Sequence, residues 1–490
     1  MPVFHNLYSR SQLKPKIVHI GFGAFHRAHQ ALFADELAQI SQSDWGYCEI
    51  SLLGGDKLIE NLRQQNHIFT VVEKGVNGPS IKTVGSVCES LHLKLDGHEK
   101  IIEKIAAPET CIVSITITEK GYGIDLHSER LDTNNPFIKI DLDNFNKPKS
   151  AIGCIVQGLK RRMERNLTPI SVMSCDNMPE NGRKTQNAIV DFAQIVDPQL
   201  ALWIQDHIAF PSTMVDRIVP ALSEEAQAEI DSLVGEHEPC GIICEPFRQW
   251  VIEDNFAAGR PEWEKVGVEL VNDVLPYEEM KLRMLNGSHS FLAYLGYLAG
   301  YEHISDCMQD SEFKQAAYNL MMAEQAPTLS IGQQVDLQAY AQSLIERYSN
   351  PNIKHRTWQI AMDGSQKLPQ RMLESVSWHI THQSEYPYLA LAIAAWIKYV
   401  GGVDEKGQRI DVRDPKAEEL YNRFHSCNNE VARVRTLLDI PAIFGSELPA
   451  EYQFVDAVTQ AYQRVELIGA KRAVSELIKA TQNSERPQRF

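Results

Sequence analysis

The segment KIVHIGFGAFHRAHQALFADELAQI (residues 16–40) decides the fold of the first half of the chain. It begins with an apolar, β-branched run, passes through two closely spaced glycines and continues with apolar residues at helical intervals. In a dinucleotide-binding turn the first glycine permits the tight turn, and the second lets a pyrophosphate approach the backbone at the helix N-terminus. His26 replaces the third glycine of that pattern, so we expect the helix to lie slightly further from the strand. The segment predicts a strand, a turn and a helix, with a plain strand-to-helix turn as the alternative. Its candidate cofactor-binding residues are Gly21, Phe22, Gly23, Ala24, Phe25 and His26.

The residue that would hold the adenosine ribose follows the second predicted strand. YCEISLL (47–53) is followed by Gly-Gly-Asp, which makes Asp56 the candidate, whereas Glu49 lies too early to be at the strand end. No basic residue occupies positions 51–55, where a 2′-phosphate would need one. The sequence therefore favours NAD over NADP.

Strand-like and helical patterns alternate in the first half of the chain and then give way to helices. Strand-like runs at 47–53, 111–118 and 168–175 alternate with helical patterns at 56–65 and 150–166, which predicts a mostly parallel, covered sheet. We expect an α/β Rossmann-type dinucleotide-binding domain over 1–276 and a mainly α-helical C-terminal domain, carrying substrate and catalytic residues, over 277–490. The helical patterns of the second part lie at 278–300, 311–324, 335–348, 386–400, 415–425 and 450–480.

Composition limits the classes of partner. The net charge of −16 argues against nucleic acid and anionic membranes, because a phosphate-binding surface needs an excess of Lys and Arg. The longest apolar run, YLALAIAAWI (388–397), is shorter than the roughly 18 to 20 residues of a membrane-spanning helix, and residues 1–16 lack the apolar core of a secretory signal. The nine scattered cysteines suit reduced thiols. We expect a cytoplasmic monomer or small homo-oligomer without a membrane or nucleic-acid partner.

One segment raises the question of a metal. HEPCGIIC (237–244) brings His237, Cys240 and Cys244 close together in sequence. Their spacing matches no common structural zinc pattern, and no fourth ligand is evident nearby. We therefore predict no metal site.

A cluster of polar residues stands at the start of an apolar helical pattern, MKLRMLNGSHSFLAYLGY (280–297). At about 100° per residue on an ideal α-helix, Lys281, Asn286 and His289 project to one side, and Glu278 falls on the same side. These residues could form a solvated Lys–Glu pair and a hydrogen-bonded core histidine. The apolar neighbours leave little solvent-facing arc for such a polar face, so spacing alone leaves the structural and catalytic interpretations nearly balanced.

The residue types suit proton and hydride transfer. Desolvation lowers the pKa of a buried lysine, so Lys281 can act as a general base near neutral pH. Amide groups aimed at a carbonyl oxygen stabilise the alkoxide character of hydride transfer, and Asn286 is one such group. Asn177 is the second, because it follows the predicted strand 168–175 at the edge where open α/β sheets bind ligands. Its alternative is an Asx-type turn that leads into Pro179.

The spacing K-x4-N-x2-H, here Lys281, Asn286 and His289, resembles the signature of the polyol-specific long-chain dehydrogenases, the mannitol dehydrogenase family, which includes hexuronate reductases. The resemblance implies a Rossmann-type domain, a helical C-terminal domain, NAD(H) and no catalytic zinc. It implies that Lys281 is the acid/base and that Asn177 and Asn286 are oxyanion donors. It also implies that His289 positions the substrate, that Glu278 relays protons, and that Asp216 and Lys367 contact the substrate. The likeness extends through HIGFGAFHRAHQ (19–30), TEKGY (118–122), VMSCDN (172–177), DRIVP (216–220), QWVIEDNF (249–256) and DGSQKLPQR (363–371), and so covers most of the chain.

The likeness is greatest to the hexuronate-reducing members, and it implies reduction of D-fructuronate to D-mannonate at C5. Tagaturonate reduction and mannitol or arabinitol oxidation are the alternatives within the family, and a non-catalytic NAD-binding protein is the alternative outside it. By this resemblance, the mannitol-oxidising members have an arginine at the position of Gln359 in this chain. The absence of that arginine argues against mannitol as the substrate. A uronate carboxylate should bind a guanidinium group. The candidates are Arg248, Arg356 and Arg371, each of which could instead be an ordinary surface arginine.

Overall fold

The computed structural model describes residues 8–125, 128–331 and 335–484. It divides into two compact units, Met1–Leu275 and Pro276–Phe490. This boundary lies one residue from the one expected from the sequence.

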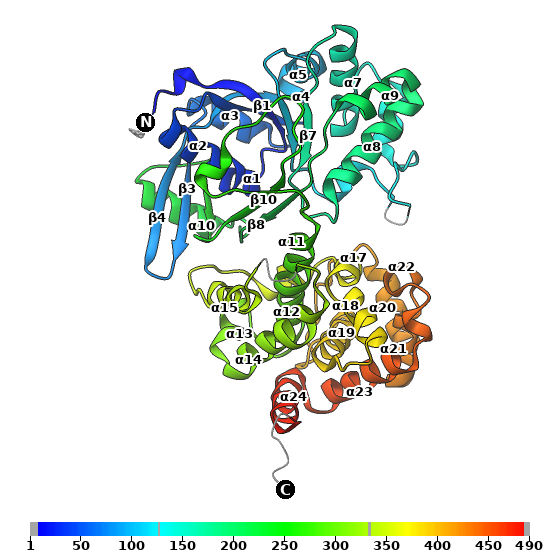
Figure 1. Ribbon diagram of the computed structural model, residues 1–490. Coiled ribbons are helices and arrows are strands. Elements are labelled where there is room, and N and C mark those ends of the chain that lie inside the picture. The colour runs from blue at the N-terminus through cyan, green and yellow to red at the C-terminus, as the bar shows by residue number, and fades with distance from the viewer. Residues whose placement is uncertain (1–7, 126–127, 332–334, 485–490) are drawn as a thin grey trace. The chain divides into compact units, whose positions relative to one another are not determined.

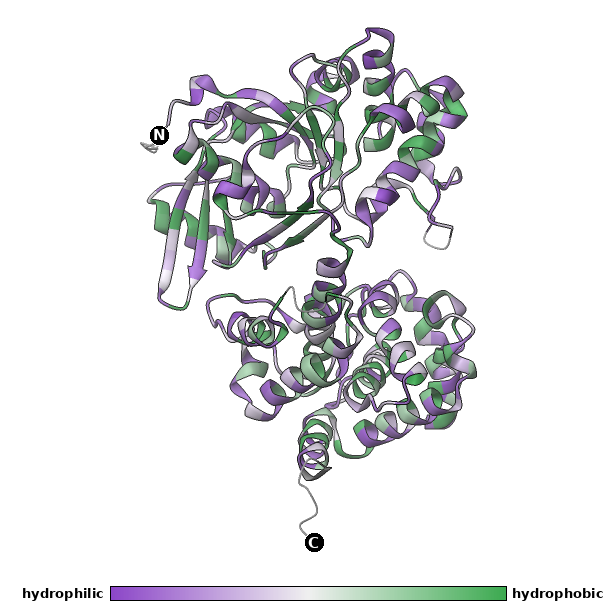
Figure 2. Cartoon of the chain, viewed as in Figure 1, coloured by the Kyte–Doolittle hydropathy of each residue, from purple (hydrophilic) through white to green (hydrophobic). Residues whose placement is uncertain are grey.

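The first unit is built on a parallel sheet of five strands in the order β5–β2–β1–β6–β7 (Figure 1). Alternate residues of β1 enter two different apolar cores. Val18 and Ile20 pack in a core with residues of α5, α7, α8 and α9, whereas Ile17 packs in one with residues of α2 and α3. Burial on both faces explains the nearly continuous apolar runs of these strands, which are mostly green in Figure 2. The predicted Rossmann-type architecture is confirmed.

The bounds of the elements in the first unit are η1 Arg10–Gln12, β1 Lys14–Ile20, α1 Ala24–Ala28, α2 Gln30–Ser41, β2 Trp45–Ser51, α3 Asp56–Gln64, β3 Phe69–Gly75, β4 Gly78–Val84, β5 Val87–His92, α4 Leu93–Asp96, α5 His98–Ile105, β6 Ile112–Ile115, η2 Glu119–Tyr122, α6 Pro136–Asp143, α7 Ala151–Glu164, β7 Ser171–Ser174, α8 Asn181–Val196, α9 Pro198–His207, β8 Thr213–Asp216, α10 Glu224–Val234, β9 Ile242–Cys244, β10 Gln249–Glu253, η3 Trp263–Val266 and β11 Glu269–Val271.

Two smaller sheets, β4–β3–β9 and β11–β10–β8, complete the first unit and were not predicted. Strand β4 is exposed over most of its length, so its sequence lacks the alternation that marks a half-buried strand. Strands β9 and β11 have only three residues each, which is too short for a periodic signal.

The second unit is helical, as predicted. Helices α12 and α19 are almost wholly buried and pack against each other, and α12 also packs against α16 whereas α19 packs against α23. In the described ranges, no helix combines the length and the apolarity needed to cross a membrane. The elements are α11 Leu275–Met280, η4 Lys281–Gly287, α12 Ser288–Leu298, α13 Ile304–Gln309, α14 Ser311–Asn319, η5 Leu320–Gln325, η6 Ala326–Thr328, α15 Leu337–Tyr348, α16 Thr357–Ala361, α17 Gly364–Leu368, η8 Pro369–Leu373, α18 Glu374–Thr381, α19 Pro387–Val400, α20 Ala417–His425, α21 Glu430–Leu438, α22 Pro441–Phe444, η9 Leu448–Ala450, α23 Tyr452–Ile468 and α24 Ala470–Ser484.

Three elements of this unit, η4, η5 and η8, are π-helices, and η4 packs against the other two. The prediction of one ideal α-helix over 278–300 is therefore wrong for the part from Lys281 to Gly287. Hydrogen bonds in a π-helix join residues five apart, so Lys281 and Asn286 lie one turn apart on one side of the helix. The predicted helix over 450–480 is likewise split, because Gly469 takes a positive φ of 81° between α23 and α24.

Candidate functional site

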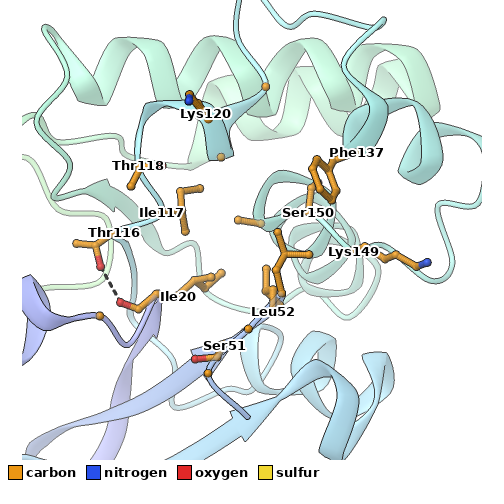
Figure 3. A pocket seen from close by; sticks show the side chains of 18 of the residues that line it. Ile20, Ser51, Leu52, Thr116, Ile117, Thr118, Lys120, Phe137, Lys149 and Ser150 are labelled. Atoms are coloured by element: carbon orange, nitrogen blue, oxygen red, sulfur yellow. Dashed lines mark hydrogen bonds between the residues drawn. The ribbon is translucent and has the colours of Figure 1, made fainter. Parts of the chain in front are cut away.

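A cavity of about 430 Å³ opens at the carboxyl ends of β1, β2 and β6 in the first unit. Figure 3 shows the apolar side chains of Ile20, Leu52 and Ile117 around it, with Lys120 and Lys149 also in its wall. This is the edge of a parallel sheet where ligands bind in open α/β folds. The volume lies within the roughly 300 to 1,000 Å³ of small-molecule pockets.

The glycine turn forms one wall of this cavity. Gly21 has a φ of 115°, and a Cβ there would lie 1.9 Å from the carbonyl oxygen of Thr116, so only glycine fits. At Gly23 the nearest atom to an added Cβ would be the carbonyl oxygen of Gly21 at 3.7 Å, so no neighbouring segment packs against this glycine and the space beside its backbone is open. Bare backbone beside an open cavity fits the approach of a pyrophosphate, as the sequence predicted.

The predicted cofactor residues fall into two groups. Gly21, Phe22 and Gly23 line the cavity, whereas Ala24, Phe25, His26 and Asp56 are not among its lining residues. Asp56 begins α3 directly after the lining residue Gly55, and its carboxylate accepts a hydrogen bond from Lys94 Nζ at 2.7 Å. The role of Asp56 toward a ribose stays a prediction.

Sequence reasoning missed the wall of the cavity that comes from three later segments. Residues 116–123, of which all but Glu119 and Tyr122 line the cavity, follow β6 at the same sheet edge, so the rule that ligands bind beyond the carboxyl ends of strands would have found them. Asp176 fixes this segment, since its carboxylate accepts the backbone N–H groups of Ile117 at 2.8 Å and Thr118 at 3.0 Å. Burial raises the pKa of Asp176 to about 6. The segments at 135–138 and 149–151 carried no sequence signal that we could read.

His26 is fully buried in a polar cluster and not exposed to the cavity. Its ring stacks on that of His19, with centroids 3.5 Å apart, and its Nε2 lies 2.8 Å from Glu49 Oε1. Burial lowers the pKa of His26 to about 3 and raises that of Glu49 to about 8. Burial therefore disfavours the charged form of both groups.

The second unit carries the Lys-Asn-His residues on η4 and the first turn of α12. Lys281, Asn286 and His289 are 6–7% exposed, and Glu278 at 7% is equally buried. Asn286 Nδ2 and His289 Nε2 are buried and have no hydrogen-bond partner among the residues that the structure describes. An unpaired buried polar atom costs about 1 to 3 kcal/mol, which a binding site recovers when a ligand supplies the partner.

Close packing of the three π-helices sets the shape of this region. A Cβ at Gly287 would lie 2.8 Å from Gln325 Nε2 of η5 and 3.0 Å from the carbonyl oxygen of Arg371 of η8. Gln325 Nε2 donates to that same carbonyl at 3.0 Å. The glycine that follows Asn286 therefore lets all three segments meet.

His289 is surrounded by rings and cations. Its ring stacks on Tyr348, with centroids 4.9 Å apart, and meets His355 edge-on at 4.9 Å. Burial holds the pKa of His289 well below its usual value, and the charges of Arg371 and Lys367 act in the same direction. The imidazole is therefore neutral at physiological pH and can donate or accept one hydrogen bond on Nε2.

The three candidate arginines differ in their surroundings. Arg371 is 8% exposed, and its Nη1 donates to Ser290 Oγ at 2.9 Å, next to His289. Arg248 pairs with Glu36 and lies over the ring of Phe33 at 4.1 Å in the first unit. Arg356 is 59% exposed and lies 3.8 Å from Glu302. Of the three, only Arg371 lies in the Lys-Asn-His region.

The remaining predicted residues are placed as follows. Asn177 is exposed and lies three residues beyond the end of β7, and Asp216 is the buried last residue of β8. Lys367 is the second-last residue of α17, and its Nζ donates to the carbonyl oxygen of Ile360 at 3.4 Å. Their roles toward a substrate stay predictions.

The cysteine segment shows no convergence on an ion. His237 Nδ1 pairs with Asp231 at 2.8 Å, and its side chain is 69% exposed. Cys240 and Cys244 are buried, and burial raises the pKa of each thiol to about 12. Among the described residues, none of these three belongs to a group whose ligand atoms lie close enough to share an ion.

Comparison with known proteins identifies both units. Residues 15–265 match the model of the mannitol dehydrogenase Rossmann domain, and residues 273–466 match that of the mannitol dehydrogenase C-terminal domain. The oxidoreductase YdfI of Escherichia coli is 54% identical over 96% of each chain. The D-mannonate oxidoreductase of the same organism is 52% identical over 97% of this chain and 98% of its own. A ternary complex of Pseudomonas fluorescens mannitol 2-dehydrogenase with NAD and D-mannitol has a TM-score of 0.88 at 36% identity, over 97% of this chain and 96% of the other.

Proposed function

Since this chain belongs to the mannitol dehydrogenase family, we propose that it reduces D-fructuronate to D-mannonate with NADH and catalyses the reverse oxidation with NAD. Family membership makes the chain an NAD-dependent oxidoreductase that acts on CH–OH groups of polyols or sugar acids. The choice of a uronate as the substrate goes beyond family membership and is our proposal. The near full-length likeness to a D-mannonate oxidoreductase supports it.

The position of Arg371 is the observation that best supports a uronate as the substrate. A guanidinium group that is 8% exposed lies within hydrogen-bond distance of Ser290, one residue after His289. A planar guanidinium binds a carboxylate through two parallel hydrogen bonds, which a neutral polyol cannot offer. A carboxylate at this place would also offset the positive field that lowers the pKa of His289.

The fit of the first unit to a dinucleotide rests on Gly21, Gly23 and the cavity that they line. When bound there, NADH supplies the hydride. The chain's own part is to hold the backbone of the turn close to the cofactor and to surround it with apolar side chains such as Leu52 and Ile117. Apolar walls exclude water from the cofactor.

Proton transfer is the task of the second unit. Lys281 gives its proton to the oxygen of the substrate carbonyl during reduction and removes it from the hydroxyl during oxidation. Asn286 Nδ2, a buried donor, stabilises the negative charge that develops on that oxygen. His289 Nε2 offers a further hydrogen bond that orients the substrate, and Glu278 passes the proton between Lys281 and solvent.

A test of the substrate compares NADH oxidation with D-fructuronate, D-tagaturonate and D-fructose under identical conditions. We expect the highest kcat/KM for fructuronate. A preference for fructose over both uronates would overturn the proposal. It would support the second candidate, a polyol dehydrogenase, which the likeness to a mannitol 2-dehydrogenase bound to D-mannitol favours.

A further inference from the structure

Three buried polar side chains lie next to the Gly21 turn, and the proposed reaction uses none of them. They are His19 of β1, His26 of α1 and Glu49 of β2, and each is fully buried. The two imidazole rings stack with planes 14° apart, and the ring of His26 is also 5.0 Å from that of Tyr47. Acidic residues are almost never fully buried unless they are paired, so this cluster needs an explanation.

The hydrogen bonds around His19 fix which ring nitrogen carries the hydrogen. The hydroxyl of Thr116 donates its only hydrogen to the carbonyl oxygen of Gly21 at 2.8 Å (Figure 3). This hydroxyl can therefore only accept from His19 Nε2, which lies 2.8 Å away, and the Gly21 oxygen at 3.2 Å is likewise an acceptor. Nε2 must carry the hydrogen, and Nδ1 then accepts from the Ser114 hydroxyl at 2.8 Å.

The carbonyl oxygen of Gly21 is thus held from several sides. The N–H of Gly23 donates to it at 2.6 Å, in addition to Thr116 and His19. Gly21 and Gly23 both line the cavity. Gly21 has a positive φ, and because glycine is conformationally permissive this peptide could adopt many other conformations. The donors His19, on β1, and Thr116, directly after β6, select one of those conformations before any ligand binds.

We propose that His19 is a positioning residue for cofactor binding, whose Nε2–H fixes the Gly21 turn in the conformation that accepts the dinucleotide. His26 holds the ring of His19 by stacking, and Glu49 in turn holds His26 through its hydrogen bond. A turn that is ordered in advance does not spend binding free energy on its own ordering, so affinity for the cofactor is higher.

A shared metal ion does not explain the cluster. The ligand atoms of His19, His26 and Glu49 lie within 4.8 Å of one another. Rings stacked at 14° direct their nitrogen lone pairs along nearly parallel planes, which do not converge on one ion. The Nε2 of His19 also carries a hydrogen, so it has no lone pair to offer.

Two amide variants separate the role of Nε2 from that of Nδ1. In His19→Gln the side-chain nitrogen reaches about as far as Nε2, whereas in His19→Asn it reaches only about as far as Nδ1. We expect His19→Asn to raise the dissociation constant of NADH about tenfold, which corresponds to about 1.4 kcal/mol, while His19→Gln changes it less than about threefold. The dissociation constant is measured by titrating the intrinsic tryptophan fluorescence with NADH. The control is His207→Asn on the exposed end of α9, where we expect no change.

Positioning predicts that kcat at saturating NADH falls by less than the dissociation constant rises, because cofactor binding restores the turn. Equal effects of the Asn and Gln variants, or no effect of either, would overturn the proposal. If His19→Asn fails to fold, Thr116→Val serves instead, since it removes the partner hydroxyl with little change in volume. An unchanged NADH affinity in a folded Thr116→Val protein would overturn the proposal as well.

The inference rests on the proposed use of a dinucleotide. The unaltered protein is therefore titrated with NADH first, and lack of binding there would refute the proposed function. If the unaltered protein binds NADH and the variants do not separate, only the positioning role of His19 is refuted.

Discussion

The ring of His289 stacks on the ring of Tyr348, with their planes 18° apart, while the Tyr348 hydroxyl donates to the carbonyl of Leu285 at 2.8 Å. One side chain thus holds both the imidazole and the backbone of η4. Tyr348→Phe keeps the stacking and removes the hydroxyl, and we expect it to lower the free energy of unfolding by about 1 kcal/mol and to reduce kcat. Tyr348→Leu, which also removes the stacking, should reduce kcat further. Thermal unfolding and steady-state kinetics measure both effects, and a kcat unchanged in Tyr348→Leu would contradict the role given to this pair.

Removal of the amine at position 281 should abolish most of the proton transfer. We expect Lys281→Ala to lower kcat by about 10² to 10⁴, the usual contribution of general acid–base catalysis, with little change in NADH affinity. Added methylamine should restore part of the rate, because it supplies the missing amine. The control is Lys314→Ala on the exposed side of α14, which should keep full activity. Near-normal turnover of Lys281→Ala would refute the assignment.

Arg371 should distinguish a uronate from a neutral ketose. We expect Arg371→Lys to raise the KM for fructuronate more than tenfold, because an ammonium group cannot form the paired hydrogen bonds of a guanidinium. The KM for fructose, which has no carboxylate, should change much less. Arg356→Lys on the exposed N-terminal side of α16 is the matched control. A parallel rise of both KM values would show that Arg371 acts on the shape of the site and not on the carboxylate.

Glu49 should make stability depend on pH. Burial raises its pKa to about 8, although His19 and Arg27 act in the opposite direction, whereas an unfolded chain has a glutamate pKa of about 4.3. Between about pH 4.3 and about pH 8 the folded protein therefore keeps the proton on Glu49, whereas the unfolded chain loses it. The stability contribution is therefore full below about pH 4.3 and is lost as the pH rises through about 8.

Glu49→Gln cannot ionise and should escape this loss. Its melting temperature relative to that of the unaltered protein should rise from pH 5 to pH 9, as measured by thermal unfolding across that range. Glu60→Gln, an exposed carboxylate on α3, is the control and should show no such trend. A constant difference between Glu49→Gln and the unaltered protein would mean that Glu49 is ionised throughout.

Gly287 should be intolerant of any side chain. A Cβ there would lie within 3.0 Å of both Gln325 Nε2 and the carbonyl oxygen of Arg371, and the latter is backbone that cannot move away easily. We expect Gly287→Ala to cost about 1 to 3 kcal/mol of stability and to lower kcat. Chemical denaturation measures the first effect. Gly54→Ala, at a position without a positive φ and with no atom within 4 Å of the added Cβ, tests whether an added methyl group alone affects stability.

The sequence predicted the Rossmann-type sheet and the Lys-Asn-His cluster because both leave short-range patterns. A β-branched run followed by Gly21 and Gly23 signals β1 and its turn, and closely spaced polar residues in an apolar helix signal a site. The π-helical geometry of η4 left no such pattern, since the 3.6-residue periodicity presumes an α-helix. The hairpin of β3 and β4 was missed because β4 is mostly exposed.

Long-range contacts explain what the sequence could not decide for the site. The sequence could not distinguish between Arg248, Arg356 and Arg371. Only their surroundings in the fold separate the guanidinium group that pairs with Glu36 from the one that lies beside His289. The burial of His26 against His19 was equally hidden. Its place in the glycine pattern indicated the cofactor turn, whereas its side chain turns to Glu49.

The π-helical segment η4 also has a consequence for the length of the chain. Each of its hydrogen-bonded turns closes over one residue more than an α-helical turn does, so the segment holds a residue that a regular helix would not need. Deleting one residue within it would let α11 and α12 join as an unbroken α-helix. If all the residues were kept and the segment became a regular α-helix, His289 would instead turn by about 100° around the helix axis relative to Lys281. The alignment of these groups therefore depends on the wider π-helical turn, because the same residues in an unbroken α-helix would point His289 and Lys281 in different directions.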